Sequence, residues 1–391
     1  MALYCYAILA TKHQTRLRVL LAKLTWAVFI ACGLFLLFPA KFSFAIPTAN
    51  NPILATMYTL LHSMDSSYNQ APSLHVIFCV IFYNEFKKLI NSKTALFLVR
   101  GWLVLVAAST WFTFQHHCID IFTGIIVGVA INYFITRPQH YVASIYLMIS
   151  GLSLLIASSI QETSPFTAAL SYYLCLSFAL ISIQYLRNKP KSLGKSHSTF
   201  SLLAWLLYAP YLLAYRLLWS VNNYKIESHQ TTSNSTSLAN GVITKVSDKL
   251  LVGPRLSNAN LIHLPADCMF IDLSAEVAEA SAVDRNQYLF FPMLDLQAPC
   301  SSQLVPAVRA VQTKISNKET VYLHCAMGYS RSFLIACIYL IAYQDYSPRD
   351  AKNYLFSLNN TIKLPESYVS NDDLLVLAKH CIAFDAKQPA S

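Results

Sequence analysis

Long apolar runs dominate the first half of the chain and nearly vanish from the second. A helix needs about 20 predominantly apolar residues to cross the ~30 Å hydrocarbon core of a bilayer. Such runs are found at residues 19–40, 73–90, 95–115, 118–136, 141–159 and 165–186. This pattern predicts six membrane-spanning helices.

A seventh apolar run, residues 200–215, is shorter than the others. It contains Pro210 and is followed directly by Arg216. A run of this length is compatible with a crossing helix, a re-entrant segment or a helix lying in the membrane interface. The sequence leaves these three possibilities open.

The pattern changes after Arg216. The segment "NNYKIESHQTTSNSTSLAN" is polar and rich in Ser, Thr and Asn, which is typical of a linker without a packed core. We therefore predict a membrane domain at residues 1–220, a polar linker at 221–240 and a soluble domain at 241–391.

Short apolar segments in the last third read as strands separated by helical patterns. They are "KLLVG", "CMFIDLS", "YLFFPML" and "TVYLHC", and a helical pattern begins at Ser332. Alternating strands and helices favour an α/β domain. The predicted fold is a multi-pass α-helical membrane bundle followed by a soluble α/β domain.

Composition agrees with a membrane protein. Of the 391 residues 55% are hydrophobic and 12% are charged, and the mean hydropathy is +0.43, whereas soluble domains are about a quarter charged. The net charge of +10 lies in short clusters between apolar runs, which indicates topology and not nucleic-acid binding. The ten cysteines form no C-x-x-C pair, so no disulfide framework, metal site or cofactor is expected.

The basic clusters orient the predicted bundle. Lys and Arg are enriched in cytoplasmic loops. The clusters are Lys12, Arg16 and Arg18; Lys87, Lys88, Lys93 and Arg100; Arg137; and Arg187, Lys189, Lys191 and Lys195. The long loop at 39–72 holds Lys41 alone and should face outward. The side occupied by the soluble domain depends on whether the seventh run crosses.

The stretch "YLHCAMGYSRSF" places a short loop between a predicted strand and a predicted helix. Backbone N–H groups and the helix dipole in such a loop bind anions. Gly328 permits the turn, and Arg331 can hold a phosphoryl group through two parallel hydrogen bonds. That field favours the thiolate of Cys325 as a nucleophile, while Ser332 could stabilise the thiolate when it leaves.

A phosphoenzyme mechanism also needs an acid for the leaving oxygen. Asp295, in "FPMLDLQAP", follows a predicted strand and is our candidate. The pattern H-C-x-x-G-x-x-R-S at residues 324–332 resembles the signature of dual-specificity protein tyrosine phosphatases, over roughly residues 241–385. The resemblance implies that Cys325 is the nucleophile, Arg331 the phosphate clamp and Asp295 the general acid.

Two further stretches, "NQAPSLHV" and "STWFTFQHHCIDIFTG", bring ionisable residues to the ends of predicted spans. Such residues are costly near a membrane and are usually functional. His116 and Asp120 are four residues apart, so Asp120 can orient the imidazole as a nucleophile. His75 begins another span on the same predicted outer side.

These stretches resemble the type 2 phosphatidic acid phosphatase superfamily, and "PSLH" is closest to its inositol phosphorylceramide synthase-like branch. The resemblance implies His116 as nucleophile, His75 as acid and Asp120 as the partner of His116, with Ser73 and Lys41 as substrate contacts. Thr110 stands where the third motif of the family has arginine, and the first motif is absent.

The whole sequence resembles bacterial inner-membrane fusions of these two families. We expect a membrane-bound phosphatase with a Cys325 site and a second, histidine-based lipid phosphate site on the outer face. Its substrate would be a phosphorylated lipid or a phosphoprotein. The alternatives are a lipid headgroup phosphotransferase with an auxiliary phosphatase domain, or a sensor that binds phosphates without catalysis. Oligomeric state and the identity of the ester are not indicated.

Overall fold

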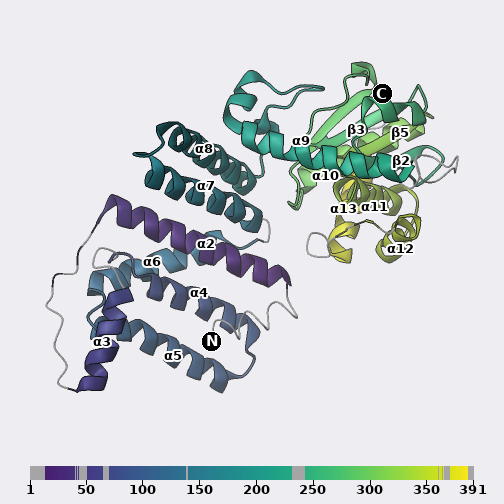
Figure 1. The fold of residues 1–391 in the computed structure, drawn as a ribbon. Coiled ribbons are helices and arrows are strands. Elements are labelled where there is room, and N and C mark those ends of the chain that lie inside the picture. Colours follow the sequence, from purple (N-terminus) through teal and green to yellow (C-terminus); the bar gives the residue numbers. More distant parts are fainter. Residues whose placement is uncertain are drawn as a thin grey trace. The chain divides into compact units, whose positions relative to one another are not determined.

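The computed structural model describes residues 14–39, 41, 43, 51–64, 70–137, 140–230, 243–359, 361, 362, 364 and 370–385. The chain forms two compact units, Met1–Gly151 and Leu152–Ser391. Figure 1 shows helices alone in the described part of the first unit, and helices together with a sheet in the second.

Apolar helices pack around α4 in the first unit. The helices are α2 (Gln14–Leu37), α3 (Pro52–Met64), α4 (Leu74–Leu89), α5 (Lys93–Phe112), α6 (Cys118–Phe134) and α7 (His140–Ile160), which continues into the second unit. α4 contacts α2, α5 and α6. Small residues allow the closest approach, because a Cβ on Gly128 of α6 would lie 2.8 Å from the Cβ of Val80 on α4.

Five of the described helices are long and apolar enough to cross a membrane: Arg16–Leu37, Lys93–Phe112, His140–Ile160, Pro165–Arg187 and Leu202–Tyr224. Two predicted spans, residues 73–90 and 118–136, form shorter helices of 16 and 17 residues. His75 is the second residue of α4, and His116 and His117 directly precede α6.

A polar cluster lies inside the bundle of the first unit. Lys23 Nζ donates to Glu85 Oε1 at 2.6 Å and to Asn132 Oδ1 at 2.8 Å, and both charged side chains are almost fully buried. Ionisable groups inside a membrane bundle are tolerated when they pair with one another. The pair therefore neutralises its own charge within the apolar core.

The second unit contains two long helices before its sheet. α8 (Pro165–Arg187) leads through η1 (Pro190–Leu193) into α9 (Leu202–Gln230). The predicted linker began at residue 221, but α9 continues through its first ten positions to Gln230. The remaining linker positions, 231–240, lie outside the described residues.

The sheet confirms the predicted α/β class. The strands are β1 (Thr244–Lys245), β2 (Leu250–Pro254), β3 (Met269–Ser274), β4 (Tyr288–Met293) and β5 (Val321–Cys325), in the order β1-β2-β5-β3-β4. β5 pairs in parallel with β2 and β3, β4 pairs in parallel with β3, and β1 is antiparallel to β2. All four segments predicted as strands are strands.

Helices and short 3-10 turns complete this domain. They are η3 (Asn258–His263), η4 (Arg285–Gln287), α10 (Ser301–Ser316), α11 (Arg331–Tyr343), α12 (Pro348–Leu358) and α13 (Asn371–Asp385). Alternate side chains of the central strands pack into two hydrophobic cores. Leu323 packs in the core that contains α11, and Tyr322 packs in the other. Twelve of the thirteen α11 residues are buried. The end of β5 and the start of α11 therefore lie at the centre of the domain.

Candidate active site

The loop between β5 and α11 is a tight turn that depends on glycine. β5 ends at Cys325 and α11 begins at Arg331. Gly328 has φ +73°, and a Cβ there would lie 2.7 Å from the carbonyl carbon of Gly253 at the end of β2. A side chain at position 328 would therefore strain the backbone and collide with the neighbouring strand.

Cys325 lies at the bottom of this turn, buried with 2% of its surface exposed. Its Sγ is 3.6 Å from the hydroxyl oxygen of Ser332, in the first turn of α11. The carbonyl of Cys325 accepts a hydrogen bond from the Arg255 N–H at 2.8 Å. The unpaired N–H groups and the dipole at the start of α11 favour an anion beside the sulfur.

Arg331 is held rigidly by a buried carboxylate. Its Nη1 donates to Glu276 Oε2 at 2.7 Å and to the Met293 carbonyl at 2.6 Å. Burial disfavours the charged guanidinium, but Glu276, Asp295 and Cys325 offset this and raise the pKa of Arg331 well above its usual range. The clamp is therefore permanently charged and fixed in orientation.

Asp295 lies on the loop after β4, next to the clamp. Its Oδ1 is 3.4 Å from Arg331 Nη2, and its backbone N–H donates to Glu276 Oε1 at 2.7 Å. The Tyr215 hydroxyl of α9 donates to Asp295 Oδ2 at 3.4 Å. Glu276 thus positions both Arg331 and the loop that carries Asp295.

His324 forms a buried ion pair behind the loop. Its Nε2 lies 2.8 Å from Glu279 Oε2, and its Nδ1 lies 3.9 Å from Asp272 Oδ1. Burial lowers the pKa of His324, but Glu279 and Asp272 outweigh this and raise it. Burial raises the pKa of Glu279, but His324 outweighs this effect and lowers it to about 2. The pair is therefore an imidazolium with a carboxylate.

Lys195, from the segment between α8 and α9, completes this cluster. Its Nζ donates to Asp272 Oδ2 at 2.5 Å and to the Ser274 carbonyl at 2.6 Å, and its side chain is 1% exposed. Ligand atoms of Asp272, Glu279 and His324 lie within 4.8 Å of one another, a grouping that could hold a metal ion. Here the ammonium and the imidazolium already supply the positive charge that two buried carboxylates require.

The candidate histidine residues of the first unit also come together. The His75 and His116 ring centroids are 6.2 Å apart, and His116 Nδ1 is 3.6 Å from Asp120 Oδ2. His116 and Asp120 are buried, whereas His75 is exposed. Asp120 also accepts the His117 N–H at 2.8 Å, which fixes the start of α6.

The two predicted substrate contacts of this site differ in placement. Ser73 is fully buried at the start of α4, and its N–H donates to the Asp120 carbonyl at 3.0 Å. Lys41 is exposed, two residues before Ser43, whose N–H donates to His117 Nε2 at 3.4 Å. Thr110, at the position where the family motif has arginine, is buried.

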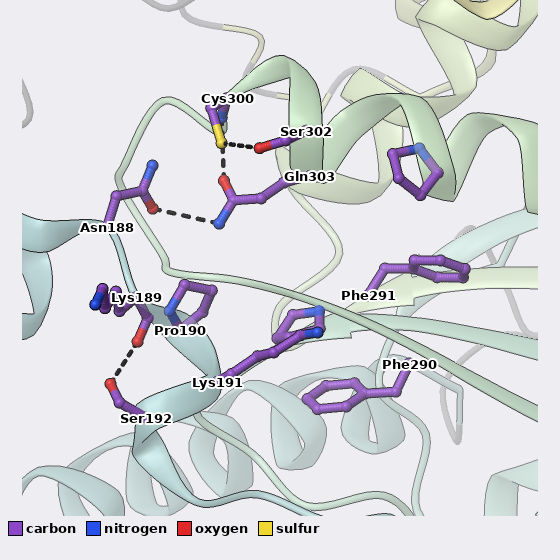
Figure 2. Close-up of a pocket in the computed structure, with 12 residues that line it drawn as sticks. Asn188, Lys189, Pro190, Lys191, Ser192, Phe290, Phe291, Cys300, Ser302 and Gln303 are labelled. Carbon is purple, nitrogen blue, oxygen red and sulfur yellow. Dashed lines mark hydrogen bonds between the residues drawn. The ribbon is translucent and has the colours of Figure 1, made fainter. Parts of the chain in front are cut away.

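Among the described residues, cavities adjoin the sheet domain, and two of them are lined in part by α9 or by the segment that follows α8. One of about 540 Å³ lies between α9 and the segment after β3; its lining includes Arg216, Trp219, Arg255 and Glu276. The other, of about 600 Å³, is lined by residues 188–192, residues 290–292 and the start of α10, and it contains none of the predicted catalytic residues. Figure 2 shows Lys189 and Lys191 on the wall opposite Cys300 and Gln303.

Four residues of the cysteine site were not identified from sequence: Glu276, Glu279, Lys195 and Tyr215. Glu276 and Glu279 follow "FIDLS" directly, and two acids just after a buried strand are a signal that sequence reasoning can use. Lys195 reads as one of several loop lysines, and Tyr215 lies within an apolar run. For these two, only tertiary contacts reveal the role.

Residues 262–371 match the sequence profile described as "Dual specificity phosphatase, catalytic domain". The second unit therefore contains a cysteine-based phosphatase domain. No curated protein matches the chain.

Several solved structures resemble the same domain. PTPMT1 in complex with PI(5)P is 19% identical, covers 37% of this chain and 98% of its own, and gives a TM-score of 0.33. Human DUSP28 is 17% identical, with 36% and 94% covered and a TM-score of 0.30. A leucine rich repeat and phosphatase domain containing protein from Entamoeba histolytica is 18% identical, with 38% and 96% covered and a TM-score of 0.28.

Proposed function

We propose that the protein is a membrane-bound phosphoric monoester hydrolase that works through a Cys325 phosphoenzyme. The supporting observation is the convergence of a nucleophile, a clamp and an acid at one loop. Cys325 ends the central strand, Arg331 begins the following helix, and Asp295 lies 3.4 Å from the clamp. A phosphate monoester bound there would contact all three groups.

In the first step the Cys325 thiolate attacks phosphorus and forms an S–P bond. The P–O bond to the leaving group breaks, and Asp295 donates its proton to the departing oxygen. Arg331 and the N–H groups of the loop hold the equatorial oxygens, where charge is spread in the transition state. The product alcohol then leaves.

In the second step water attacks the phosphorus of the phosphocysteine. Asp295, now a carboxylate, takes a proton from that water, and the S–P bond breaks to release inorganic phosphate. The sulfur recovers its electron pair as a thiolate. The Ser332 hydroxyl, 3.6 Å from the sulfur, can donate a hydrogen bond to it.

The test is release of inorganic phosphate from a soluble aryl phosphate by the purified full-length protein. Cys325→Ser should abolish it, and Asp295→Asn should slow it most for esters with poor leaving groups. The control is Cys300→Ser, an exposed thiol outside the site, which should keep full activity. Undiminished hydrolysis by Cys325→Ser would refute the proposal.

We also propose a second lipid phosphate site in the first unit. It is supported by the approach of the His75 and His116 rings and by the contact between His116 and Asp120. His116 would attack phosphorus, and His75 would protonate the leaving oxygen. Water as acceptor makes this site a phosphatase, and a lipid alcohol makes it a headgroup transferase.

Product analysis separates these two outcomes. In a Cys325→Ser background, inorganic phosphate indicates hydrolysis, whereas phosphate found on a second lipid indicates transfer. His116→Ala should abolish either product. His117→Ala, which replaces the adjacent histidine, should retain it. Activity that survives His116→Ala would exclude a histidine nucleophile at this position.

A further inference from the structure

α9 has two opposite faces of different character. One face is buried and consists of Ala204, Tyr208, Tyr211, Leu212 and Tyr215. The opposite face is apolar yet exposed, and we call it the α9 stripe: Leu202, Leu203, Leu206, Leu213, Leu217, Val221 and Tyr224. At 100° per residue, the two sets lie on opposite sides of the helix.

The phosphatase domain contacts the chain just before α9 and again in the second half of the helix. Just before α9, Lys195 pairs with Asp272, and the His197 carbonyl accepts the Glu279 N–H at 3.0 Å. Within α9, the Trp219 indole N–H donates to the Arg255 carbonyl at 2.9 Å. Both contact regions thus belong to one soluble domain.

The middle of α9 contacts the last turns of α8. The Tyr208 hydroxyl accepts from Gln184 Nε2 at 3.2 Å, and the Tyr185 and Tyr211 hydroxyls are 3.1 Å apart. α8 ends at Arg187, followed by Lys189 and Lys191, the basic cluster typical of the cytoplasmic membrane surface. The centre of α9 therefore lies level with that surface.

These contacts are incompatible with a crossing helix. From residue 202 to residue 219, α9 rises about 26 Å, close to the ~30 Å thickness of a hydrocarbon core. A crossing would place Lys195 and Trp219 on opposite sides of the membrane. Yet both are bound to the same sheet domain, which cannot enter the bilayer.

We propose that α9 lies flat in the membrane interface and holds the phosphatase domain against the bilayer surface. The occupant of the α9 stripe is the lipid surface itself. Three observations favour lipid: the stripe is long and apolar, α9 contacts the end of α8, a helix long enough to span, and Lys189 and Lys191 directly after α8 suit anionic headgroups. The phosphatase domain then lies on the side where α8 ends.

This placement points to a membrane lipid as substrate, an inference that rests on the proposed function of Cys325. α9 contacts two residues next to the cysteine site: Tyr215 donates to Asp295, and the Trp219 ring lies 4.2 Å from the guanidinium of Arg255, whose backbone N–H donates to the Cys325 carbonyl. The lining of the cavity of about 540 Å³ next to these residues includes apolar side chains of α9, the two arginines Arg216 and Arg255, and Glu276 and Glu279, which pair with Arg331 and His324. A phosphorylated lipid headgroup entering from the bilayer fits such a lining.

Membrane topology tests the flat helix. Single cysteines replace Glu162, Lys191 and Val376 in full-length chains whose exposed native cysteines are serine, and intact cells are labelled with an impermeant maleimide. Lys191→Cys and Val376→Cys should give the same labelling result, because both cysteines lie on one side of the membrane. Glu162→Cys should give the opposite result. Labelling of Val376→Cys on the same side as Glu162→Cys would show that α9 crosses and would overturn the proposal.

Hydrolysis tests the substrate. Full-length protein carrying His116→Ala, so that only the cysteine site acts, is reconstituted in phosphatidylcholine vesicles that contain phosphatidic acid, and a soluble aryl phosphate is assayed in parallel. Leu206→Asp and Leu213→Asp should each lower phosphatidic acid turnover about tenfold or more and leave aryl phosphate turnover within about twofold. Val376→Asp, the matched change on α13, should alter neither.

The possible failures are distinguishable. Loss of both activities in the parent protein would contradict the proposed function itself. Aryl phosphate hydrolysis with phosphatidic acid left intact would overturn the lipid substrate alone. Equal losses on both substrates in the stripe variants would show that the stripe supports folding and does not present the lipid.

Discussion

At the scale of single residues, Glu276 holds the cysteine site together. One of its oxygens pairs with Arg331 and the other accepts the Asp295 N–H, both at 2.7 Å. It touches neither the sulfur nor the position of the phosphorus, so it is a positioning residue. Its carboxylate fixes Arg331 and Asp295, the proposed clamp and general acid, in one geometry before the substrate arrives.

Glu276→Gln should preserve an acceptor for Asp295 but remove the charge that orients Arg331. We expect kcat to fall about 10- to 100-fold and vanadate to bind more weakly, because a misplaced clamp stabilises the transition state less. Steady-state kinetics and vanadate inhibition check this. Gln303→Glu, an amide-carboxylate exchange on α10, is the matched control and should leave both unchanged.

The pair of His324 and Glu279 predicts a pH dependence of stability. The raised pKa of His324 gives stabilisation that is complete below the ordinary value of 6.5 and is lost as pH rises through the folded value. The pKa of Glu279, lowered from 4.5 to about 2, gives stabilisation that is present above 4.5 and is lost as pH falls toward 2. The pair is therefore most effective between these ordinary values.

Glu279→Gln should accordingly lower the melting temperature most near pH 5 to 6, and less at alkaline pH. Thermal unfolding of the full-length protein in detergent, measured from pH 5 to 9, checks this. A difference that stays constant over the whole range would contradict a charged pair at this position.

At the scale of elements, the segment between α8 and α9 belongs to the phosphatase domain. Lys195 was predicted as a cytoplasmic loop charge, but its ammonium is buried against Asp272 on β3. Tyr288 of β4 donates to the same carboxylate at 2.8 Å, and the carboxylate raises the pKa of that tyrosine in addition to the effect of burial. Asp272 on β3 thus pairs with a residue that precedes it by 77 positions.

Lys195→Met should destabilise the domain by about 3–5 kcal/mol, because it leaves Asp272 buried without its closest cation. Lys191→Met removes a charge from the exposed part of the same segment and should be nearly neutral. Thermal unfolding of both variants makes the comparison. Equal stability of the two would mean that Asp272 is satisfied by His324 and Tyr288 alone.

At the scale of the whole molecule, the functional boundary lies earlier than the sequence suggests. The sequence changes from long apolar runs to a more polar pattern at residues 221–240. The second compact unit, however, begins at Leu152 and includes α8 and α9. The predicted division at residues 221–240 stays a prediction, but α9 occupies the first ten of these positions. α8 and α9 belong to the same compact unit as the phosphatase domain.

A fragment that starts at residue 243 should therefore be much less stable than one that starts at residue 188. The shorter fragment loses the Lys195 ion pair and exposes the surface that α9 covers, a loss of several kcal/mol. Expression of both fragments in detergent, followed by thermal unfolding, measures the difference. Matching melting temperatures would show that the contacts of α9 do not stabilise the domain.

Local patterns in the sequence were sufficient for several features. Apolar runs predicted the helices of the first half except α3, which lies in the segment predicted as a loop, and apolar segments separated by helical patterns predicted four of the strands. The spacing from His324 to Ser332 predicted the turn that holds Cys325, because nine consecutive residues on a strand, a loop and a helix are positioned by local geometry. Asp295 was predicted in the same way, as an acid just after a strand; it lies 3.4 Å from Arg331, and its role as general acid stays a prediction.

Tertiary structure alone decided the rest. Glu276 reaches Arg331 across 55 positions, and Lys195 reaches Asp272 across 77. The buried face of α9 is apolar and aromatic like its exposed stripe, so periodicity could not tell which face meets protein and which meets lipid. Contacts between distant segments leave no local pattern, because burial and pairing depend on neighbours that folding brings together.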